Sequence, residues 1–307
     1  MAAEGGTKAI LAALFANAGI AVAKFIGFLV TGSSSMIAEA VHSVADTSNQ
    51  GLLLVGMRSS KREASAEHPF GYGRNRYFYS FVVALVLFTL GSVFALYEGI
   101  HKIQEPEPLS TAYVAVIILV VAIGLESYSF YTAIVESRKV KGGATWVQFV
   151  RQAKTPELPV VLLEDAGALL GLVFALIGVG LSVLTGNPVW DGVGTICIGV
   201  LLGVIAIILI IEMKSLLIGE GSGPAELHAI RAALTDGNID RVIHIKTQYV
   251  GPDELLVAAK IAVRGSRSTA DVAGAIDEAE TRVRAAVPAA RMIYLEPDLD
   301  RSPAEAT

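Results

Sequence analysis

The chain has 307 residues, of which 53% are hydrophobic and 17% charged, and its mean hydropathy of +0.58 is too high for a soluble globular protein. A formal net charge of -5 without a basic stripe argues against a nucleic-acid partner. The single cysteine, Cys197, excludes a disulfide framework and a thiolate metal site. Because the apolar residues are concentrated before about residue 215, we expect a transmembrane domain over residues 1–214 and a soluble domain over residues 215–307.

Several hydrophobic stretches are long enough to cross a lipid bilayer as helices. There are six of them, over residues 9–31, 35–58, 77–100, 111–135, 158–184 and 190–213. The connections before the third and fifth stretches are rich in Lys and Arg, whereas the other three carry only Lys102. The positive-inside rule therefore predicts a multi-pass integral membrane protein with both termini in the cytoplasm. In a bacterium, this membrane would be the plasma (inner) membrane.

Charged side chains inside two predicted spans suggest a site for a divalent cation at membrane depth. His42, Asp46 and Asn49 recur at i, i+4 and i+7 and share one helical face, and Glu164 and Asp165 lie in the fifth span. A charge at the bilayer centre costs at least about 2.5 kcal/mol, so such residues are functional by default. Imidazole and carboxylate one turn apart suit a metal ion. The alternative is a polar network that only joins helices.

Other polar and small residues in the spans have several interpretations. Lys24 is expected to pair with a carboxylate such as Glu39, and Glu126 either lines the cation pathway or pairs with a neighbour. Glu164 and Asp165 are expected to face the same neighbouring helix. Glycines of the same span, such as Gly178, allow that neighbour to approach closely.

Two segments between the spans have distinctive compositions. Residues 67–80 are dense in Gly, Pro and aromatic side chains, which is typical of a rigid turn at the membrane interface. Residues 142–154 alternate apolar and polar side chains and predict a short amphipathic helix on the inner membrane surface.

The tail has the periodicity of a small α+β domain. The expected order is helix 224–235, strands 241–249 and 254–263, helix 268–286 and strand 291–295. The sequence GPDE at 251–254 predicts a turn that joins the first two strands as a hairpin. Ser268 and Asp271 have the spacing of a capping box. An αββαβ order suits one layer of helices on a sheet.

With these residues in view, the chain resembles the cation diffusion facilitator family over about residues 8–298. The shared marks are the H-x-x-x-D spacing of His42 and Asp46, the HPFGYGR loop that begins at His68, and six membrane helices before an αββαβ tail. The segments VVLLEDAGALLG, GPDELLVAAK and YLEPD are similar to the branch that contains zinc transporter nine.

The resemblance implies a secondary active transporter, not an enzyme, that works as a homodimer in the bilayer and exports Zn²⁺ in exchange for protons. It implies no cofactor and a ferredoxin-like cytoplasmic tail that mediates dimer contacts. By matching motif, His42, Asp46 and Asp165 would be metal ligands. The family pattern has His or Asp four residues before Asp165, where this chain has Val161. A tetrahedral site then needs another fourth ligand, for which Glu164 is the first choice and Asn49 or a water molecule the second.

Two further metal sites of the family are expected to be empty in this chain. In the 67–80 loop, Tyr72 stands where a second histidine can follow His68, and the tail has only His228 and His244. Other functions stay open: export of Mn²⁺, Fe²⁺ or Co²⁺ by the same architecture, or a metal-sensing membrane scaffold that does not transport. A membrane hydrolase is disfavoured because no H-E-x-x-H or comparable motif occurs.

Overall fold

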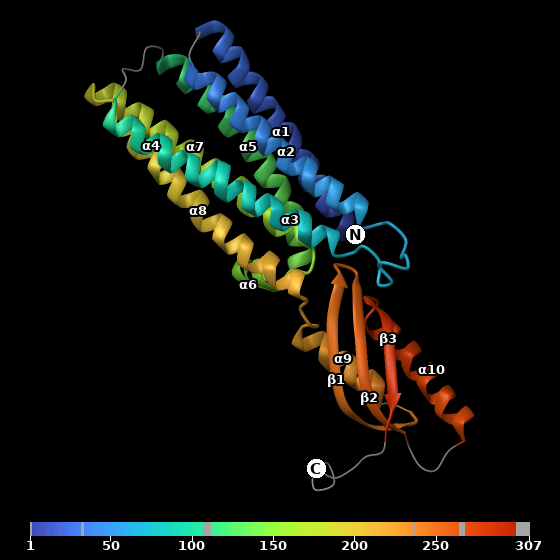
Figure 1. Cartoon of the computed structure of the whole chain (residues 1–307). Coiled ribbons are helices and arrows are strands. Elements are labelled where there is room, and N and C mark those ends of the chain that lie inside the picture. Colours follow the sequence, from blue (N-terminus) through green and yellow to red (C-terminus); the bar gives the residue numbers. More distant parts are fainter. Residues whose placement is uncertain (1, 32–33, 107–111, 236, 264–267, 299–307) are drawn as a thin grey trace. The chain divides into compact units, whose positions relative to one another are not determined.

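The computed structural model describes residues 2–31, 34–106, 112–235, 237–263 and 268–298 (Figure 1). Within these ranges, the side chains of residues 2–5, 27–28, 30–31, 34–42, 45 and 112 lie outside the described part. The chain packs into two compact units, one formed by Met1–Lys61 with Asn75–Lys214 and the other by Arg62–Arg74 with Ser215–Thr307. That residues 1–214 form a cation transport domain and residues 215–307 a cytoplasmic domain stays a prediction.

The first unit is a bundle of helices that run alongside one another (Figure 1). Its elements are α1 (Ala2–Thr31), α2 (Ser34–Ser59), α3 (Asn75–Val86), the π-helix η1 (Leu87–Val93), α4 (Phe94–Gln104), α5 (Ala112–Lys141), α6 (Trp146–Gln152), α7 (Glu157–Thr185) and α8 (Val189–Ile218). The expected third span is therefore a rod of three consecutive elements, α3, η1 and α4. The short helix expected within 142–154 is α6.

In the described residues, five helical segments are long and apolar enough to cross a membrane. They are Gly6–Ile26, Asn75–Gln104, Tyr113–Lys141, Glu157–Thr185 and Val189–Ile218. The expected second span corresponds to α2, whose Glu39, His42 and Asp46 lower its hydropathy and part of which lies outside the described side chains. Five of the six expected spans are thus confirmed as helices long and apolar enough to cross a membrane. That there are six spans stays a prediction.

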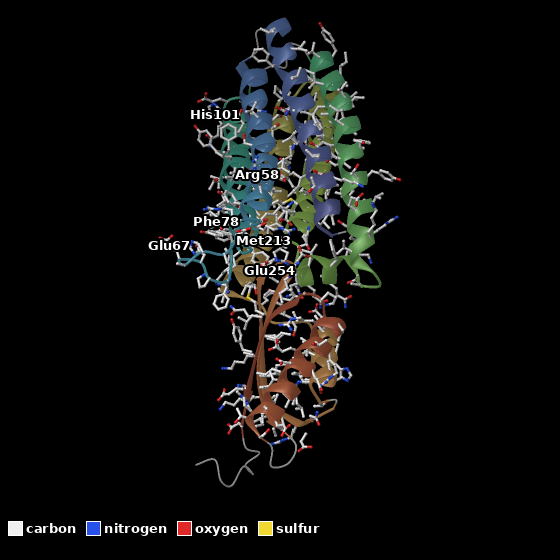
Figure 2. All side chains as sticks on the ribbon, turned by 90° about the vertical axis from the view of Figure 1, so that its right-hand side faces the viewer. Arg58, Glu67, Phe78, His101, Met213 and Glu254 are labelled. Carbon is white, nitrogen blue, oxygen red and sulfur yellow. The ribbon has the colours of Figure 1, made fainter. Side chains whose placement is uncertain are left out.

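The outer surface of the bundle is apolar. Large hydrophobic side chains project from it, including Phe15, which is 70% exposed, and Leu184, which is 83% exposed; Phe78 is labelled in Figure 2. Soluble monomers rarely expose contiguous apolar surface on this scale, whereas lipid tails would cover it. The protein is therefore an integral membrane protein.

Glycines bring α8 close to two other helices. A Cβ atom on Gly178 of α7 would lie 2.9 Å from the carbonyl oxygen of Trp190, and one on Gly99 of α4 would lie 2.8 Å from the backbone nitrogen of Ile196. Contacts this close require small residues, as in other membrane helix pairs. The helix that the glycines of α7 allow to approach closely is therefore α8.

The tail contains α9 (Pro224–Thr235), β1 (Ile239–Gly251), β2 (Glu254–Val263), α10 (Thr269–Ala286) and β3 (Ala290–Pro297). The strand order is β1-β2-β3, with β1 and β2 antiparallel and β2 and β3 parallel. The parallel pair needs a crossover, which α10 supplies. Apolar residues of both helices and of one sheet face form a single core that includes Ile230, Leu234, Val257, Ile261 and Val283.

This arrangement confirms the predicted αββαβ order and the hairpin, whose turn is Pro252–Asp253. The capping box is also confirmed, because the Ser268 hydroxyl accepts from the Asp271 amide at 3.3 Å and an Asp271 carboxylate oxygen accepts from the Ser268 amide at 3.1 Å. The finer assignment to the ferredoxin-like fold stays a prediction.

A buried tyrosine should make the stability of the tail fall in alkali. Tyr249 is 3% exposed, and its hydroxyl donates to Glu226 at 2.8 Å. Burial, and then this hydrogen bond, raise the pKa of Tyr249 above its ordinary value of about 10. The folded tail therefore keeps the proton that the unfolded chain loses. The contribution of protonated Tyr249 to the stability of the folded tail is complete below about pH 10, and it is lost as the pH rises through the raised pKa.

We expect Tyr249→Phe to flatten this alkaline loss of unfolding temperature, measured by calorimetry between about pH 9 and pH 11. The control is Tyr294→Phe, which removes a phenol that is 59% exposed and should leave the pH dependence unchanged. Identical curves for Tyr249→Phe and the parent protein would contradict the prediction.

Candidate cation site

Six of the described carboxylates line one cavity inside the bundle, which has a volume of about 280 Å³. Four of them, from three helices, interact electrostatically with one another: Asp46 on α2, Glu126 on α5, and Glu164 and Asp165 on α7. Glu126, Glu164 and Asp165 are 3%, 6% and 1% exposed. Lys24 of α1 lines the same cavity. The arrangement gathers excess negative charge in a membrane-spanning bundle, which a divalent cation would neutralise.

The cavity extends from these carboxylates toward one end of the bundle. Its lining includes Glu98 and Lys102 of α4 and Asp191 of α8. Lys102 and Asp191 form an ion pair at 3.0 Å at that end. Among the described residues, the lining does not include Arg76 or Glu157, which are buried at the opposite end. The cavity thus reaches from the carboxylates to the end of the bundle where Lys102 lies.

Asp165 is held by a hydrogen bond from another helix. The Ser129 hydroxyl of α5 donates to the Asp165 Oδ2 atom at 2.6 Å, and Ser129 is fully buried. A hydrogen bond to a charged group is short and directional, so it fixes the orientation of the carboxylate. The other oxygen of Asp165 is then presented in a defined direction.

Glu164 is held from the opposite side, by two amides of α2. Asn49 Nδ2 donates to Glu164 Oε1 at 3.3 Å, and Gln50 Nε2 donates to Glu164 Oε2 at 2.9 Å. The two adjacent carboxylates of α7 therefore bond to different helices, α2 and α5, and the expectation that both face one neighbour is wrong. Successive helical residues point about 100° apart, and each of these two reaches a separate helix.

The structure brings some of the predicted site residues together and leaves others untested. Asp46, Glu164 and Asp165 share the cavity, and Asn49 contacts Glu164. His42 lies in α2, but its side chain is outside the described residues, as is that of Glu39, so the expected pair of Glu39 with Lys24 is also untested.

Sequence reasoning missed Gln50 and Ser129 as contacts of the carboxylates. Gln50 follows Asp46 by one helical turn and Ser129 follows Glu126 by three residues, so each shares a helix face with a predicted polar residue. This spacing is the signal in the sequence by which the two residues could have been found. Glu126 was expected either to line the pathway or to pair with a neighbour; it lines the cavity and interacts electrostatically with Asp165, Asp46 and Lys24.

The donor set defines which ions fit. Among the described side chains, which do not include that of His42, no group of three or more His, Cys, Asp or Glu residues lies in metal-binding geometry. The carboxylate oxygens, with one imidazole nearby in sequence, suit Zn²⁺, Mn²⁺, Fe²⁺ or Co²⁺. Val161 is fully buried and offers no ligand atom.

The loop at Arg62–Arg74 is organised around Tyr72. Its ring packs edge-on against His68 with centroids 4.6 Å apart, its hydroxyl lies 3.2 Å from that of Ser65, and the Arg62 guanidinium lies 4.5 Å from its centre. Tyr72 thus has a packing role at the position where some family members place a metal-binding histidine.

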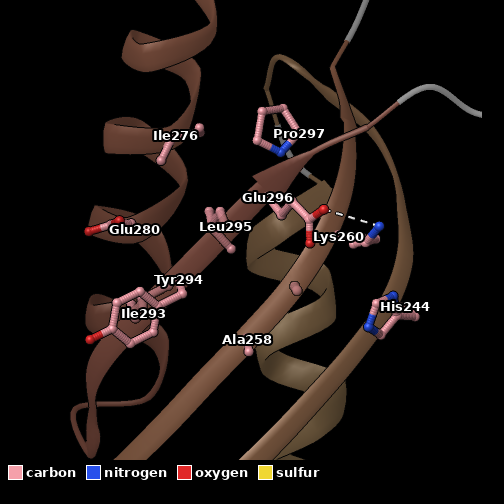
Figure 3. Close-up of a pocket in the computed structure, with 11 residues that line it drawn as sticks. His244, Ala258, Lys260, Ile276, Glu280, Ile293, Tyr294, Leu295, Glu296 and Pro297 are labelled. Carbon is pink, nitrogen blue, oxygen red and sulfur yellow. Dashed lines mark ion pairs between the residues drawn. The ribbon is translucent and has the colours of Figure 1, made fainter.

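A second cavity, of about 530 Å³, lies in the tail and is shown in Figure 3. His244 lines it, together with Lys260 and Glu296, which pair at 3.1 Å. Hydrogen bonds to Glu296 and Asp298 raise the pKa of the half-buried Lys260 ammonium group. His228 lies on the exposed side of α9. That neither histidine binds metal stays a prediction.

A bundle of apolar helices with carboxylates around an internal cavity has the charged, buried lining that is typical of functional sites inside membrane proteins. A family model described as the cation efflux transmembrane domain matches residues 10–218, which contain α2 to α8 and residues 10–31 of α1. The chain belongs to this family, the cation diffusion facilitators, and not to a family of enzymes.

Relatives in several kingdoms share most of the chain. The mouse proton-coupled zinc antiporter SLC30A9, mitochondrial, is 32% identical over 84% of this chain and 46% of its own length. Metal tolerance protein C4 of Arabidopsis thaliana is 31% identical over 84% of this chain and 57% of its own. The magnetosome protein MamB of a Magnetospira strain is 26% identical over 78% of each. The chain spans about half the length of the SLC30A9 relatives that it matches.

Proposed function

We propose that this protein is a secondary active transporter that exports a divalent metal cation, with Zn²⁺ as the first candidate, in exchange for protons. The observation that supports it is the cavity lined by Asp46, Glu126, Glu164 and Asp165 inside a membrane-spanning bundle. The printed name of the mouse relative, a proton-coupled zinc antiporter, supports the choice of ion and of coupling.

In this proposal, His42, Asp46 and Asp165 bind the ion, and Glu164, supported by Asn49, supplies the fourth ligand position that Val161 leaves vacant. On the cytoplasmic side, near neutral pH, deprotonated ligands bind the metal. On the other side, arriving protons compete for the same ligands and release it. The protonated ligands then return, because empty charged ligands are costly inside a bilayer.

The organisation of the whole protein follows from the same proposal. Residues 1–214 form the transport domain in the bilayer, and residues 215–307 form a cytoplasmic domain through which two copies associate as a homodimer. Both termini lie in the cytoplasm, as the basic connections indicate. The membrane is the plasma membrane of a bacterium or a membrane of corresponding polarity.

A second candidate is an exporter of Mn²⁺, Fe²⁺ or Co²⁺. The observation that favours it is the oxygen-rich donor set around the cavity, combined with Val161 at the position where the family pattern has His or Asp. Carboxylate ligands suit Mn²⁺ better than they suit softer ions.

Purified protein in liposomes that hold a pH dye and a metal dye tests the proposal. Zn²⁺, Mn²⁺, Fe²⁺, Co²⁺ and Cd²⁺ are added in turn, with Glu164→Gln beside the parent and Ser137→Ala as the control, because Ser137 is buried outside the cavity lining of the described residues. We expect metal entry with opposite proton movement, reduced or re-ranked among metals in Glu164→Gln. Binding of every metal without flux would overturn the proposal in favour of a sensor or scaffold.

A further inference from the structure

We propose that Gln50 is a positioning residue of the cation site: it fixes the Glu164 carboxylate against α2 and thereby sets the preference of the site among divalent cations. This inference rests on the proposed transport function. It concerns a residue outside the predicted ligands.

The side chains of Gln50 and Glu164 are in direct contact. Gln50 is fully buried, and its amide nitrogen donates to Glu164 Oε2 at 2.9 Å, while Asn49 donates to Oε1. Both oxygens of Glu164 therefore receive a hydrogen bond from consecutive residues of one helix. Two donors at the two oxygens fix both the position of the carboxylate and its rotation.

Burying the amide of Gln50 costs free energy. The Gln50 Oε1 atom is buried without a hydrogen-bond partner among the described residues, as is Asn49 Oδ1. A buried acceptor without a partner costs about 1–3 kcal/mol. A methionine of similar length would fill the space without that cost. Packing alone thus does not explain a glutamine at residue 50, whereas its bond to Glu164 does.

Gln50 acts on the cation through Glu164 and is not itself a ligand of the cation. Among the described residues that line the cavity, Asp46, Glu164 and Asp165 are present and Gln50 is not. Its nitrogen, which points at Glu164, is a donor and cannot bind a cation, and its buried Oε1 atom belongs to a residue outside this lining.

The contact between Gln50 and Glu164 bears on which ion the site prefers. Asp46 and Gln50 lie one turn apart on α2, so the helix that carries one carboxylate also holds the carboxylate of Glu164 on α7. On the other side, Ser129 holds Asp165. An ion entering the cavity therefore meets carboxylates at a fixed spacing. Divalent cations differ in preferred metal–oxygen distance and in tolerance of irregular geometry, so a fixed spacing favours some over others.

The experiment compares Gln50→Met and Gln50→Asn with the parent protein in liposomes, over a concentration series of Zn²⁺, Mn²⁺ and Cd²⁺. Methionine keeps the length and removes the amide, and asparagine keeps the amide but is one methylene too short to reach Glu164. The control is Ser137→Ala, a buried serine of α5 whose hydroxyl has no partner among the described residues.

For Gln50→Met, we expect KM for Zn²⁺ to rise about 10- to 100-fold, the usual effect of removing a group that supports a ligand, with a smaller change in the maximal rate. The ratio of KM values among the three metals should also change. A role in packing alone would lower the amount of folded protein and the maximal rate equally for all metals. Unchanged KM ratios in both folded variants would overturn the inference.

The two proposals fail in different ways. If the parent protein moves none of the metals, the transport function is wrong and the inference falls with it. If the parent transports and Gln50→Met keeps its KM ratios, only the inference is wrong. Should Gln50→Met not fold, titration of Zn²⁺ and Mn²⁺ into detergent-solubilised Gln50→Asn decides the question by the ratio of the two affinities.

Discussion

We expect Asp165→Ala to abolish metal transport while the protein stays folded. The side chain is 1% exposed, lies in the cavity and is oriented by the Ser129 hydroxyl at 2.6 Å. Removing a group that merely supports a ligand lowers metal affinity by about 10- to 100-fold, and removing a ligand itself should exceed that range.

Folding should survive because the variant no longer buries this carboxylate among other acidic groups. The cost that remains is the unpartnered Ser129 hydroxyl, about 1–3 kcal/mol. The measurement is the initial rate of Zn²⁺ entry into liposomes, normalised to the amount of reconstituted protein that elutes as a single species. Asp165→Asn, which keeps the shape and can still accept from Ser129, should be equally inactive. Full activity in Asp165→Ala would remove this residue from the ligand set.

We expect the loss of the buried ion pair between Arg76 and Glu157 to destabilise the bundle by about 3–5 kcal/mol. Arg76 at the start of α3 binds Glu157 at the start of α7 with two hydrogen bonds, of 2.5 and 2.8 Å, and the two residues are 6% and 1% exposed. Arg76→Met leaves the Glu157 carboxylate buried without its cation. Most of the expected cost comes from that uncompensated charge.

The unfolding temperature of the detergent-solubilised protein measures this effect. The double variant Arg76→Met with Glu157→Leu should recover most of the loss, because replacing both charges by apolar groups is often neutral. The control is Arg284→Gln, which breaks an exposed pair with Glu280 on α10 and should change stability by about 0–1 kcal/mol. A parent-like unfolding temperature for Arg76→Met would contradict the prediction.

The elements of this protein were largely predictable because their signals are local. Runs of apolar residues predicted the spans, the GPDE sequence predicted the hairpin turn between β1 and β2, and Ser268 with Asp271 predicted the start of α10. Each depends on residues that are near one another in the chain, so hydropathy and spacing suffice to find them.

The contacts of the site were less predictable because they join distant segments. Glu164 and its partner Gln50 are 114 residues apart, and Asp165 and Ser129 are 36 apart. The sequence placed Glu164 and Asp165 on one stripe of α7, but it carries no local signal for which helix packs against each side. Gln50 shares a helix face with Asp46, but its bond to Glu164 could be recognised only in the folded structure.

The π-helix Leu87–Val93 changes which residues the rest of its rod presents to a neighbour. An α-helix turns about 100° per residue, and the wider π turn absorbs additional residues, so α4 is out of phase with a straight continuation of α3. With this offset, Gly99 packs against Ile196 and Lys102 reaches Asp191 on α8, while Arg76 on α3 reaches α7. One rod thereby joins two different helices, each by an ion pair, at its two ends.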